Sequence, residues 1–496
     1  MANLWAVSSR FQAYFFPFLL VLVTFLSFWN LSANSLEPWD ESRHAANAYE
    51  MMHRGDYINL YYNDLPDTWN AKPPLMIWAI VASYKAFGVN EFAVRFPSAV
   101  MTIVFFFFAF KIIRLYENER VAMLVCMMLV ASRAIIAFHI GRTGDADAMF
   151  IAFLTAFIYY GLKYLEFQEK NAILYAGVFL GLAFYTKGFA FGLVVPAILA
   201  YLLLKRISFP FKDKYFYFGI SIMLLFIASW IMLGAMYGEV VDNPAYRGKS
   251  AIERMLLYDI IDRFTQKVFD SKQHDHGKDY VLTVFDRRFN IWSYFMWVAL
   301  ALGFYQAYQH RKNLFQWLNQ PQNRLPLFSA CMVLSLCLIL TISVNKCDWY
   351  LAPIKLFAAY LAYKSIRWVC RFHYSFPYLM VFVWLYAFAM FYYKEIYIID
   401  DYEKIFMKKH SELIKNAPSV FDTDGITCYQ NIYVYEKWLN YKVTNAFADT
   451  NSVVIYLNNR KDYQARYHLI DSTGWFCIGK WKKEVIDTVK LKPYTN

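Results

Sequence analysis

Long apolar runs separated by short polar turns recur along almost the whole chain. The first run, FFPFLLVLVTFLSFWNL, covers residues 15–31. About 20 consecutive apolar residues are enough to cross the hydrocarbon core of a bilayer as a helix. Hydrophobic residues make up 59% of the 496 residues and charged residues only 18%, which is too few charges to cover a water-soluble protein of this size. The sequence therefore predicts an all-α polytopic membrane protein.

We predict about 11 transmembrane helices, with ends that are accurate to a few residues. They are placed at 14–31, 96–115, 120–139, 148–166, 171–186, 189–204, 215–236, 291–309, 326–343, 350–366 and 376–392. The segment PPLMIWAIVASYKAFG at 73–88 is also apolar, but its 16 residues include Lys85 and are short for a span. We expect it to form an amphipathic helix that lies on the outer membrane surface.

The distribution of Lys and Arg supports this topology, with the N-terminus inside. Most basic residues then fall in inner loops, whereas the short outer turns contain only Arg142, Lys187 and Lys346. Counting 73–88 as a span would place most basic residues outside. The formal net charge of +12 therefore reflects membrane topology rather than nucleic-acid binding.

This topology divides the chain into two parts. Residues 1–393 form a transmembrane domain with long outer loops at 32–95 and 237–290, and residues 394–496 form a small outer domain. The tail mixes strand-like alternation with helical charge patterns, as in NSVVIYLNNRKDYQARYHLID, so we expect a C-terminal α/β domain. Nearly all unusual polar residues near the membrane then face the outer side.

Two acidic pairs lie at outer membrane boundaries. Asp40 and Glu41 follow the first span in EPWDESRHA, and Asp145 and Asp147 lie in the turn GRTGDAD. Asp40 could simply cap a helix that begins near Ser42, because Asp is a favoured N-cap residue. However, carboxylates at the bilayer edge are costly to desolvate and tend to mark functional sites. The second pair on the same side favours the functional interpretation.

Basic residues gather on the same outer side. Lys72 precedes a rigid Pro-Pro pair, Lys187 lies in a tight TKG turn, and Lys346 precedes CDWY. A lysine at the end of a span is often only a snorkelling anchor. Three such lysines together with Arg43, opposite acidic groups, indicate instead a site for a lipid-linked phosphate. In sugar transfer from such a phosphate, cations stabilise the leaving group and a carboxylate serves as general base for the acceptor hydroxyl.

These motifs resemble a known family. WDESRHAANAYEMM, AKPPL and EFAVRFPSAV are together similar to the first outer loop of the lipid A aminoarabinose transferases and their relatives, the protein O-mannosyltransferases. GLAFYTKGFAFG resembles the family's TKG turn, and NKCDWYLAPIK resembles its lysine-tryptophan-tyrosine segment. The resemblance covers about residues 1–370 and weakens in the tail. It implies a C-type glycosyltransferase fold and a polyprenyl-phosphate-sugar donor.

The resemblance also implies roles for single residues. Asp40 matches the first-loop catalytic acid, which we predict to be the general base, and Asp147 matches the acid that opens the helix after the second outer turn. Glu41 and Asp145 are further candidates. The donor phosphate region is matched by Arg43, Lys72, Lys187, Arg263, Lys346 and Tyr350.

The sequence departs from the family where some relatives hold a metal. The family's Glu before the lysine is Ala71 here, and its acid-His pair is replaced by YDII at 258–261. HDH at 274–276 has no second ligand cluster and is a weak metal signal. We therefore expect no metal and no other cofactor.

Two functions from different classes remain for comparison. The first is a metal-independent glycosyltransferase of the bacterial inner membrane, which moves a sugar with inversion to an envelope glycolipid, polysaccharide or protein on the periplasmic face. The second is a flippase or transporter of the lipid-linked sugar, which predicts charges near the midplane of spans and inverted repeats. The charges crowd at the outer boundary and no repeat is visible, so the sequence favours the glycosyltransferase. A scaffold whose tail binds partners is a third possibility.

Overall fold

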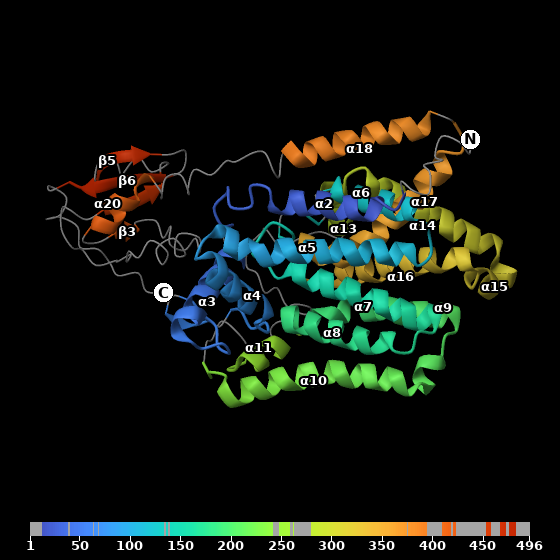
Figure 1. The fold of residues 1–496 in the computed structure, drawn as a ribbon, viewed down its shortest axis with the longest axis horizontal. Helices are drawn as coiled ribbons and strands as arrows, with labels where there is room; N and C mark the ends of the chain where they lie inside the picture. Colours follow the sequence, from blue (N-terminus) through green and yellow to red (C-terminus); the bar gives the residue numbers. More distant parts are fainter. Residues whose placement is uncertain are drawn as a thin grey trace.

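The computed structural model of the protein describes most of the chain. It covers residues 12–37, 40–62, 64–67, 69–132, 135–136, 139–241, 248–257, 261, 279–373, 375–393, 409–417, 420–422, 453–457, 467–472 and 476–482. Most of these residues are helical, and the long helices run roughly side by side in an elongated bundle (Figure 1). The prediction of a mainly helical protein with membrane-length helices is confirmed.

Every predicted span overlaps a helix. These helices are α2 (Phe15–Phe28), α5 (Glu91–Arg114), α6 (Glu119–Val130), α7 (Asp147–Phe167), α8 (Ala172–Lys187), α9 (Val195–Lys205), α10 (Lys214–Tyr237), α14 (Trp292–Gln309), α16 (Pro321–Ile342), α17 (Lys355–Val369) and α18 (Phe376–Tyr392). Within the described residues, five helical stretches are long and apolar enough to cross a membrane: α5, α7, the stretch from α8 to α9, α10 and α16. The number of 11 spans therefore stays a prediction.

The stretch from α8 to α9 is a hairpin. Lys187, at the end of α8, bonds Asp147 at the start of α7 over 2.6 Å, whereas Lys205, at the end of α9, bonds Glu166 near the other end of α7 over 2.5 Å. The chain therefore reverses between the two lysines, in the 3-10 segment η1 (Gly188–Val194). Gly188 has a φ of 57°, a left-handed conformation that glycine adopts without strain. The predicted TKG turn between two helices is confirmed.

Polar side chains decide where several helices begin and end. The side chains of Asn90, Asn118 and Asp213 accept backbone hydrogen bonds at the N-termini of α5, α6 and α10. The prediction of a helix over 120–139 is wrong in its second half, because α6 ends at Val130. Just beyond this end, the Ser132 hydroxyl bonds the Leu129 carbonyl, a local bond that competes with continued helix.

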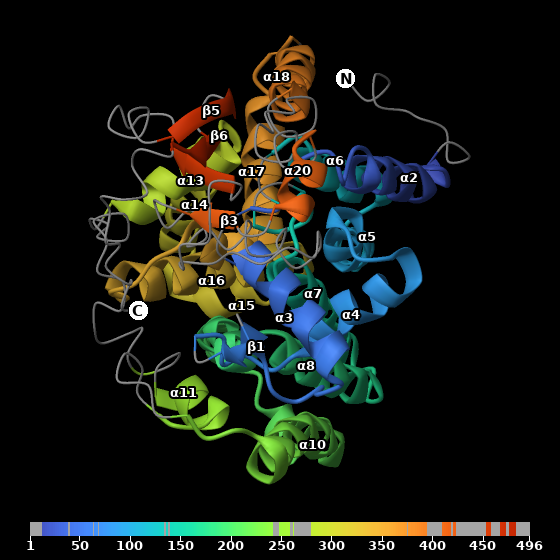
Figure 2. The same cartoon turned by 90° about the vertical axis from the view of Figure 1, so that its left-hand side faces the viewer.

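The predicted first outer loop folds over one end of the bundle (Figures 1 and 2). It contains α3 (Asp40–Arg54), an antiparallel pair of short strands, β1 (Tyr61–Tyr62) and β2 (Leu65–Pro66), and α4 (Leu75–Phe87). At about 1.5 Å per residue, the 13 residues of α4 span about 20 Å, too little to cross a bilayer core of about 30 Å. Instead, α4 packs between α3 and α5 in a small apolar core of its own. The predicted helix is observed, and its position on the membrane surface stays a prediction.

The remaining elements are short. α11 (Ala251–Leu256), α13 (Tyr280–Phe289), η4 (Arg311–Asn313), α15 (Leu314–Leu318) and η5 (Asp348–Ile354) connect or flank the long helices, and η2 (Phe209–Lys212) precedes α10. The described part of the tail contains α20 (Ser411–Asn416), β3 (Val420–Asp422), β4 (Val453–Leu457), β5 (Tyr467–Ser472) and β6 (Phe476–Trp481). The strands form one sheet in the order β3-β4-β6-β5, in which only β3 and β4 are parallel. The domain boundary at 394 stays a prediction.

Candidate active site

The two predicted acidic turns meet in the structure. Asp40 begins α3 and Asp147 begins α7, so each carboxylate lies at a helix N-terminus. One carboxylate oxygen each from Asp40 and Asp145 and one ring nitrogen of His139 all lie within 4.8 Å of one another. Asp147 is also close enough for its charge to act on His139. The structure therefore brings three of the four predicted acids around one histidine.

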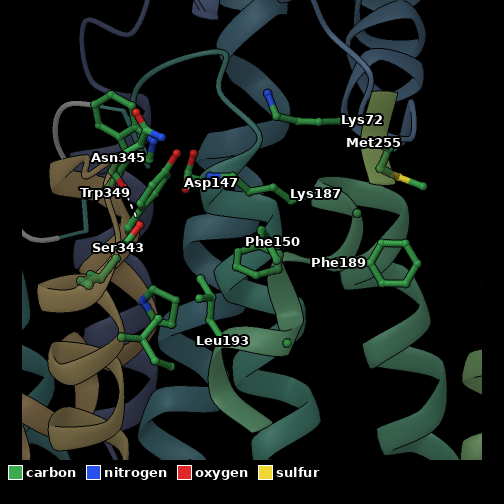
Figure 3. A pocket seen from close by; sticks show the side chains of 17 residues that line it. Lys72, Asp147, Phe150, Lys187, Phe189, Leu193, Met255, Ser343, Asn345 and Trp349 are labelled. Carbon is green, nitrogen blue, oxygen red and sulfur yellow. Dashed lines mark hydrogen bonds and ion pairs between the residues drawn. The ribbon is translucent and has the colours of Figure 1, made fainter. Parts of the chain in front are cut away.

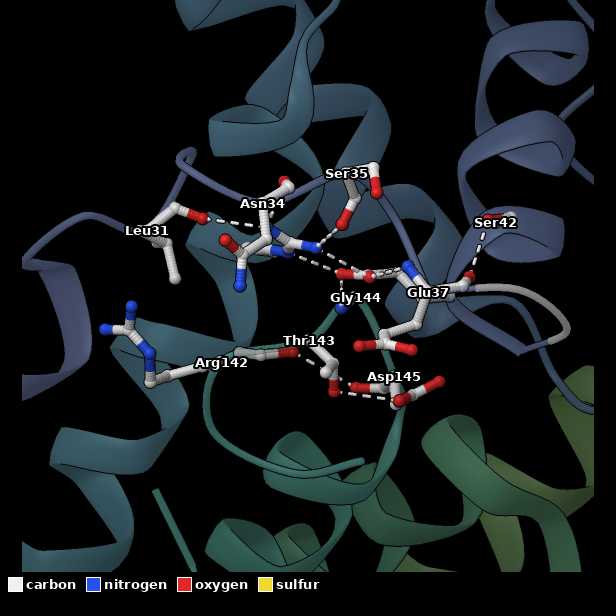
Figure 4. Close-up of polar contacts among 12 residues, drawn as sticks. Leu31, Asn34, Ser35, Glu37, Ser42, Arg142, Thr143, Gly144 and Asp145 are labelled. Carbon is white, nitrogen blue, oxygen red and sulfur yellow. Dashed lines mark hydrogen bonds and ion pairs between the residues drawn. The ribbon is translucent and has the colours of Figure 1, made fainter. Parts of the chain in front are cut away.

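The fourth acid, Glu41, joins the two turns to the bundle. Its buried carboxylate accepts hydrogen bonds from Nε and Nη2 of Arg95 at 2.7 and 2.9 Å and from the backbone N–H of Gly144 at 2.7 Å. Arg95, from α5, also donates to three backbone carbonyls between residues 31 and 35 (Figure 4). From the second turn, Arg142 donates to the carbonyl of Leu26 in α2 at 2.7 Å. Glu41 therefore positions both turns.

His139 and Asp145 form a buried ion pair, with 3.1 Å between Nδ1 and Oδ2. Burial by itself lowers the pKa of His139, but the charge and hydrogen bond of Asp145 outweigh burial and raise this pKa to about 9. For the Asp145 carboxyl, burial has the opposite effect and raises the pKa. The charge of His139 and the hydrogen bond that the Thr143 hydroxyl donates at 2.8 Å outweigh burial and bring the pKa of Asp145 below its ordinary value. At neutral pH an imidazolium therefore lies among the carboxylates.

A cavity of about 350 Å³ opens beside this cluster (Figure 3). One end of it is polar, where Lys72, Asp147 and Lys187 lie close together. Ser343 and Asn345 also line the cavity, and the remaining lining is mostly apolar, with side chains of η1, α7, α11 and α16. They include Phe150, Phe189, Leu193, Met255, Ile339 and Leu340. The cavity therefore offers a charged end and an apolar wall to a single ligand.

The charged end is held in place by contacts between α7, α8 and η5. The Lys187 ammonium donates to Asp147 at 2.6 Å and lies 5.7 Å from the ring centre of Tyr350, which also lines the cavity. The Lys72 ammonium lies 5.2 Å from the ring centre of Trp69. Of the predicted phosphate-binding residues, Lys72, Lys187 and Tyr350 thus line one cavity.

Two other predicted phosphate-binding residues, Arg43 and Lys346, are not among the residues that line this cavity. Arg43 makes a two-pronged ion pair with Asp67, at 2.7 and 2.6 Å, and is stacked near the rings of Tyr62 and Trp69. Lys346 is buried but is not among the residues that line the cavity. Arg263 lies outside the described residues. Their phosphate-binding roles stay predictions.

Among the residues that the structure describes, Asp40, His139 and Asp145 could together hold a metal. Two carboxylates and an imidazole are suitable ligands for a divalent ion, and Oδ1 of buried Asp145 has no hydrogen-bond partner within the described part of the chain. A metal would have to displace the proton of His139, because only the neutral imidazole coordinates. Most of the YDII segment and all of HDH at 274–276 lie outside the described residues.

Sequence reasoning missed His139, Arg95 and His44. His44, in α3, is buried with Nδ1 3.0 Å from the Gly144 carbonyl, and burial followed by the charge of Lys72 lowers its pKa. Arg95 directly precedes a predicted span, and His139 is the last residue of another. Placing an ionisable residue at the end of an apolar span costs free energy unless the residue is paired or functional. This pattern in the sequence could have identified Arg95 and His139.

The sequence has recognisable relatives. Residues 71–233 match the protein family described as dolichyl-phosphate-mannose-protein mannosyltransferase. An uncharacterized protein of Aquifex aeolicus is 30% identical over 220 residues, which cover 44% of this chain and 43% of the relative. The undecaprenyl phosphate-alpha-4-amino-4-deoxy-L-arabinose arabinosyl transferase of Yersinia pestis is 32% identical over 185 residues, which cover 36% of this chain and 33% of the relative. The matched regions thus span less than half of each relative.

The fold also occurs in solved structures. The crystal structure of ArnT from Cupriavidus metallidurans bound to undecaprenyl phosphate has a TM-score of 0.66 at 14% identity, covering 95% of this chain and 98% of that one. The apo oligosaccharyltransferase of Archaeoglobus fulgidus has a TM-score of 0.52 at 13% identity, covering 89% and 62%. At these identities the similarity shows a shared fold. Together with the sequence matches, it confirms the resemblance found in the motifs.

Proposed function

We propose that this chain is a membrane glycosyltransferase of the C-type superfamily that contains the lipid A aminoarabinose transferases and the protein O-mannosyltransferases, and the sequence matches and the shared fold support this proposal. It moves a sugar from a polyprenyl-phosphate donor to an acceptor of the cell envelope, which is a glycolipid, a polysaccharide or a protein. The observation that carries the proposal is the cavity with lysines and a carboxylate at one end and an apolar wall at the other.

The shape of the cavity fits the donor. The prenyl chain lies along the apolar wall near Phe189, Leu193 and Leu340, and the phosphate lies at the end that holds Lys72 and Lys187. These cations stabilise the charge that develops on the phosphate as it leaves the sugar. Tyr350 borders the same end and can donate its hydroxyl to a phosphate oxygen.

The acids carry out the proton transfer. Asp40 accepts the proton of the acceptor hydroxyl as its oxygen attacks the anomeric carbon, and the bond from that carbon to the phosphate oxygen breaks on the opposite face. A single displacement of this kind inverts the anomeric centre. Asp147, held by Lys187, orients the acceptor, and the departing phosphate needs little protonation. No step in this scheme requires a metal.

A flippase or transporter fits the charge distribution less well. The ion pairs that involve α7 lie at its two ends, with Asp147 and Lys187 at one and Glu166, Lys205 and Arg324 at the other. A translocation path would need ionisable groups between these ends, near the midplane. We place the enzyme in the bacterial inner membrane, with the site and the tail on the periplasmic face.

Mass spectrometry of envelope glycolipids, polysaccharides and glycoproteins tests the proposal. A deletion strain and a strain carrying Asp40→Asn should both lack one residue of fixed mass from the same component, and that mass names the sugar. An Asp64→Asn strain serves as the control, because Asp64 pairs with Arg54 on the exterior of the same loop. Unchanged envelope components in both the deletion and the Asp40→Asn strains would refute the proposal.

A further inference from the structure

A second cavity, of about 650 Å³, lies at the opposite end of the bundle from Asp40. It is lined by the first half of α16, the second half of α17 and the end of α9. This end of α9 contains Lys205, which bonds Glu166. Trp317 and Leu318 of α15 also line it. Figure 1 shows α9, α14, α15 and α16 together at the end of the molecule that is distant from α3. This cavity is thus separate from the candidate active site.

One wall of this cavity is a face of α14 that carries small residues. On α14, Ala299, Gly303 and Ala307 recur every four residues and therefore lie on one face. A Cβ added at Gly303 would meet no atom within 4 Å, so this wall borders open space. The opposite walls are apolar, with Leu327 and Leu334 of α16 among them. A volume of this size is typical of ligand pockets, which hold about 300–1,000 Å³.

The rim of the cavity is basic. Lys364, Arg367 and Arg371 occupy one face of α17 and its C-terminal extension, at spacings of three and four residues, and all three line the cavity. Arg367 and Arg371 are exposed, and Lys364 is 3.7 Å from Glu117. Among the described residues that line the cavity, none is acidic. The rim therefore has a net positive charge directly above an apolar interior.

We propose that this cavity binds one anionic phospholipid from the adjoining leaflet. The phosphate lies among Lys364, Arg367 and Arg371, and an acyl chain enters the space beside Gly303. Lysines and arginines near a membrane surface attract anionic lipids, and basic pockets between transmembrane helices bind their head groups. If these basic side chains only anchored α17 at the membrane surface by snorkelling, their helix face would not need to border a cavity. The proposal does not depend on the proposed sugar transfer.

Native mass spectrometry of the full-length protein, with phosphatidylglycerol or phosphatidylethanolamine added in detergent, tests this inference. The wild type should retain one phosphatidylglycerol and prefer it to phosphatidylethanolamine. Lys364→Gln, Arg367→Gln and Arg371→Gln combined should weaken this binding about 100-fold, because each basic residue near the surface contributes about 1 kcal/mol. The matched control combines Arg311→Gln and Lys312→Gln, two exposed basic residues of η4 that do not line the cavity.

A cavity-filling variant tests the apolar part separately. Gly303→Leu places a side chain in open space and raises helix propensity, so the protein should fold and lose the bound phospholipid. Equal losses in the rim variant and the η4 control would overturn the proposal, because they would indicate general surface charge. The proposal would also be overturned if the wild type bound both lipids with equal affinity or if Gly303→Leu retained the phospholipid. It would be overturned as well if a polyprenyl phosphate or a second copy of the chain occupied the cavity.

Discussion

Lys187 donates a hydrogen bond to Asp147 across 2.6 Å, and this bond links the last residue of α8 to the first residue of α7 beside the outer cavity. The charge of Lys187 is therefore compensated. The other cavity lysine differs, because Lys72 forms no ion pair with any residue that the structure describes and instead lies against the ring of Trp69. Of the two cavity lysines, Lys72 thus has the charge that no described carboxylate compensates.

Lys72→Ala should raise the KM for the polyprenyl-phosphate donor about 10- to 100-fold, because a hydrogen bond to a charged group contributes about 1.5–3 kcal/mol. The KM for the acceptor should change little. Steady-state kinetics of the purified enzyme with each substrate varied in turn measures both. Lys85→Ala is the control, since Lys85 bonds the Tyr57 hydroxyl and does not line the cavity. Equal effects of Lys72→Ala on donor and acceptor would remove Lys72 from the phosphate site.

Arg95→Met should lower the free energy of unfolding by about 3–5 kcal/mol, because it leaves the buried carboxylate of Glu41 without its charged partner. Arg114→Met should lower it by less than about 1 kcal/mol, because the ion pair of Arg114 with Glu119 is partly exposed to solvent. Denaturant titration in mixed micelles measures both variants. Similar losses in the two would show that Glu41 does not depend on Arg95.

The ion pair of Asp67 with Arg43 should make stability depend on pH. Burial raises the pKa of Asp67, but the Arg43 guanidinium outweighs burial and holds this pKa below the ordinary 3.8. A carboxyl with a lowered pKa in the folded state stabilises the fold above its unfolded pKa, and this contribution disappears as the pH falls through the folded pKa.

We therefore expect Asp67→Asn to lower the melting temperature at pH 7 and the difference from wild type to shrink below about pH 3.8. Circular dichroism melts from pH 7 to pH 3 provide the measurement. A difference that stays constant over this range would mean that folding does not shift the pKa of Asp67.

Sugar transfer should continue at an unchanged rate after dialysis against EDTA, because the protonated His139 already supplies positive charge beside Asp40 and Asp145. The assay is transfer of a radiolabelled sugar, with and without added Mn²⁺. A rate that is lost with EDTA and restored by Mn²⁺ would instead identify these three residues as a metal centre.

Single cysteines at Leu65 and Lys170, in a background without native cysteines, should show opposite accessibility. Leu65 is 61% exposed beside α3, whereas Lys170 is exposed in the turn between α7 and α8, at the far end of α7 from Asp147. In intact spheroplasts, a membrane-impermeant maleimide should label the cysteine at 65 and spare the one at 170. The reverse pattern would place the site in the cytoplasm.

The sequence alone was enough to locate most of the long helices and the two acidic turns. A long apolar run predicts a helix, because a segment buried in lipid must satisfy its own backbone hydrogen bonds and a helix does so within the segment. The same reasoning located the reversal at Gly188 and the acids Asp40 and Asp147, since a polar residue at the end of an apolar run stands out. The positions of these helices and turns depend on interactions between residues that are only a few positions apart in the sequence.

Only the tertiary structure decided which charges meet. Glu41 and Arg95 are 54 positions apart, and only tertiary packing brings them together, so the structure shows an anchoring contact for a predicted site acid. Arg43 pairs with Asp67 for the same reason. The pairing of buried charges depends on which helices pack side by side, because burying an unpaired charge is costly, and the spacing of residues along the chain does not record that packing.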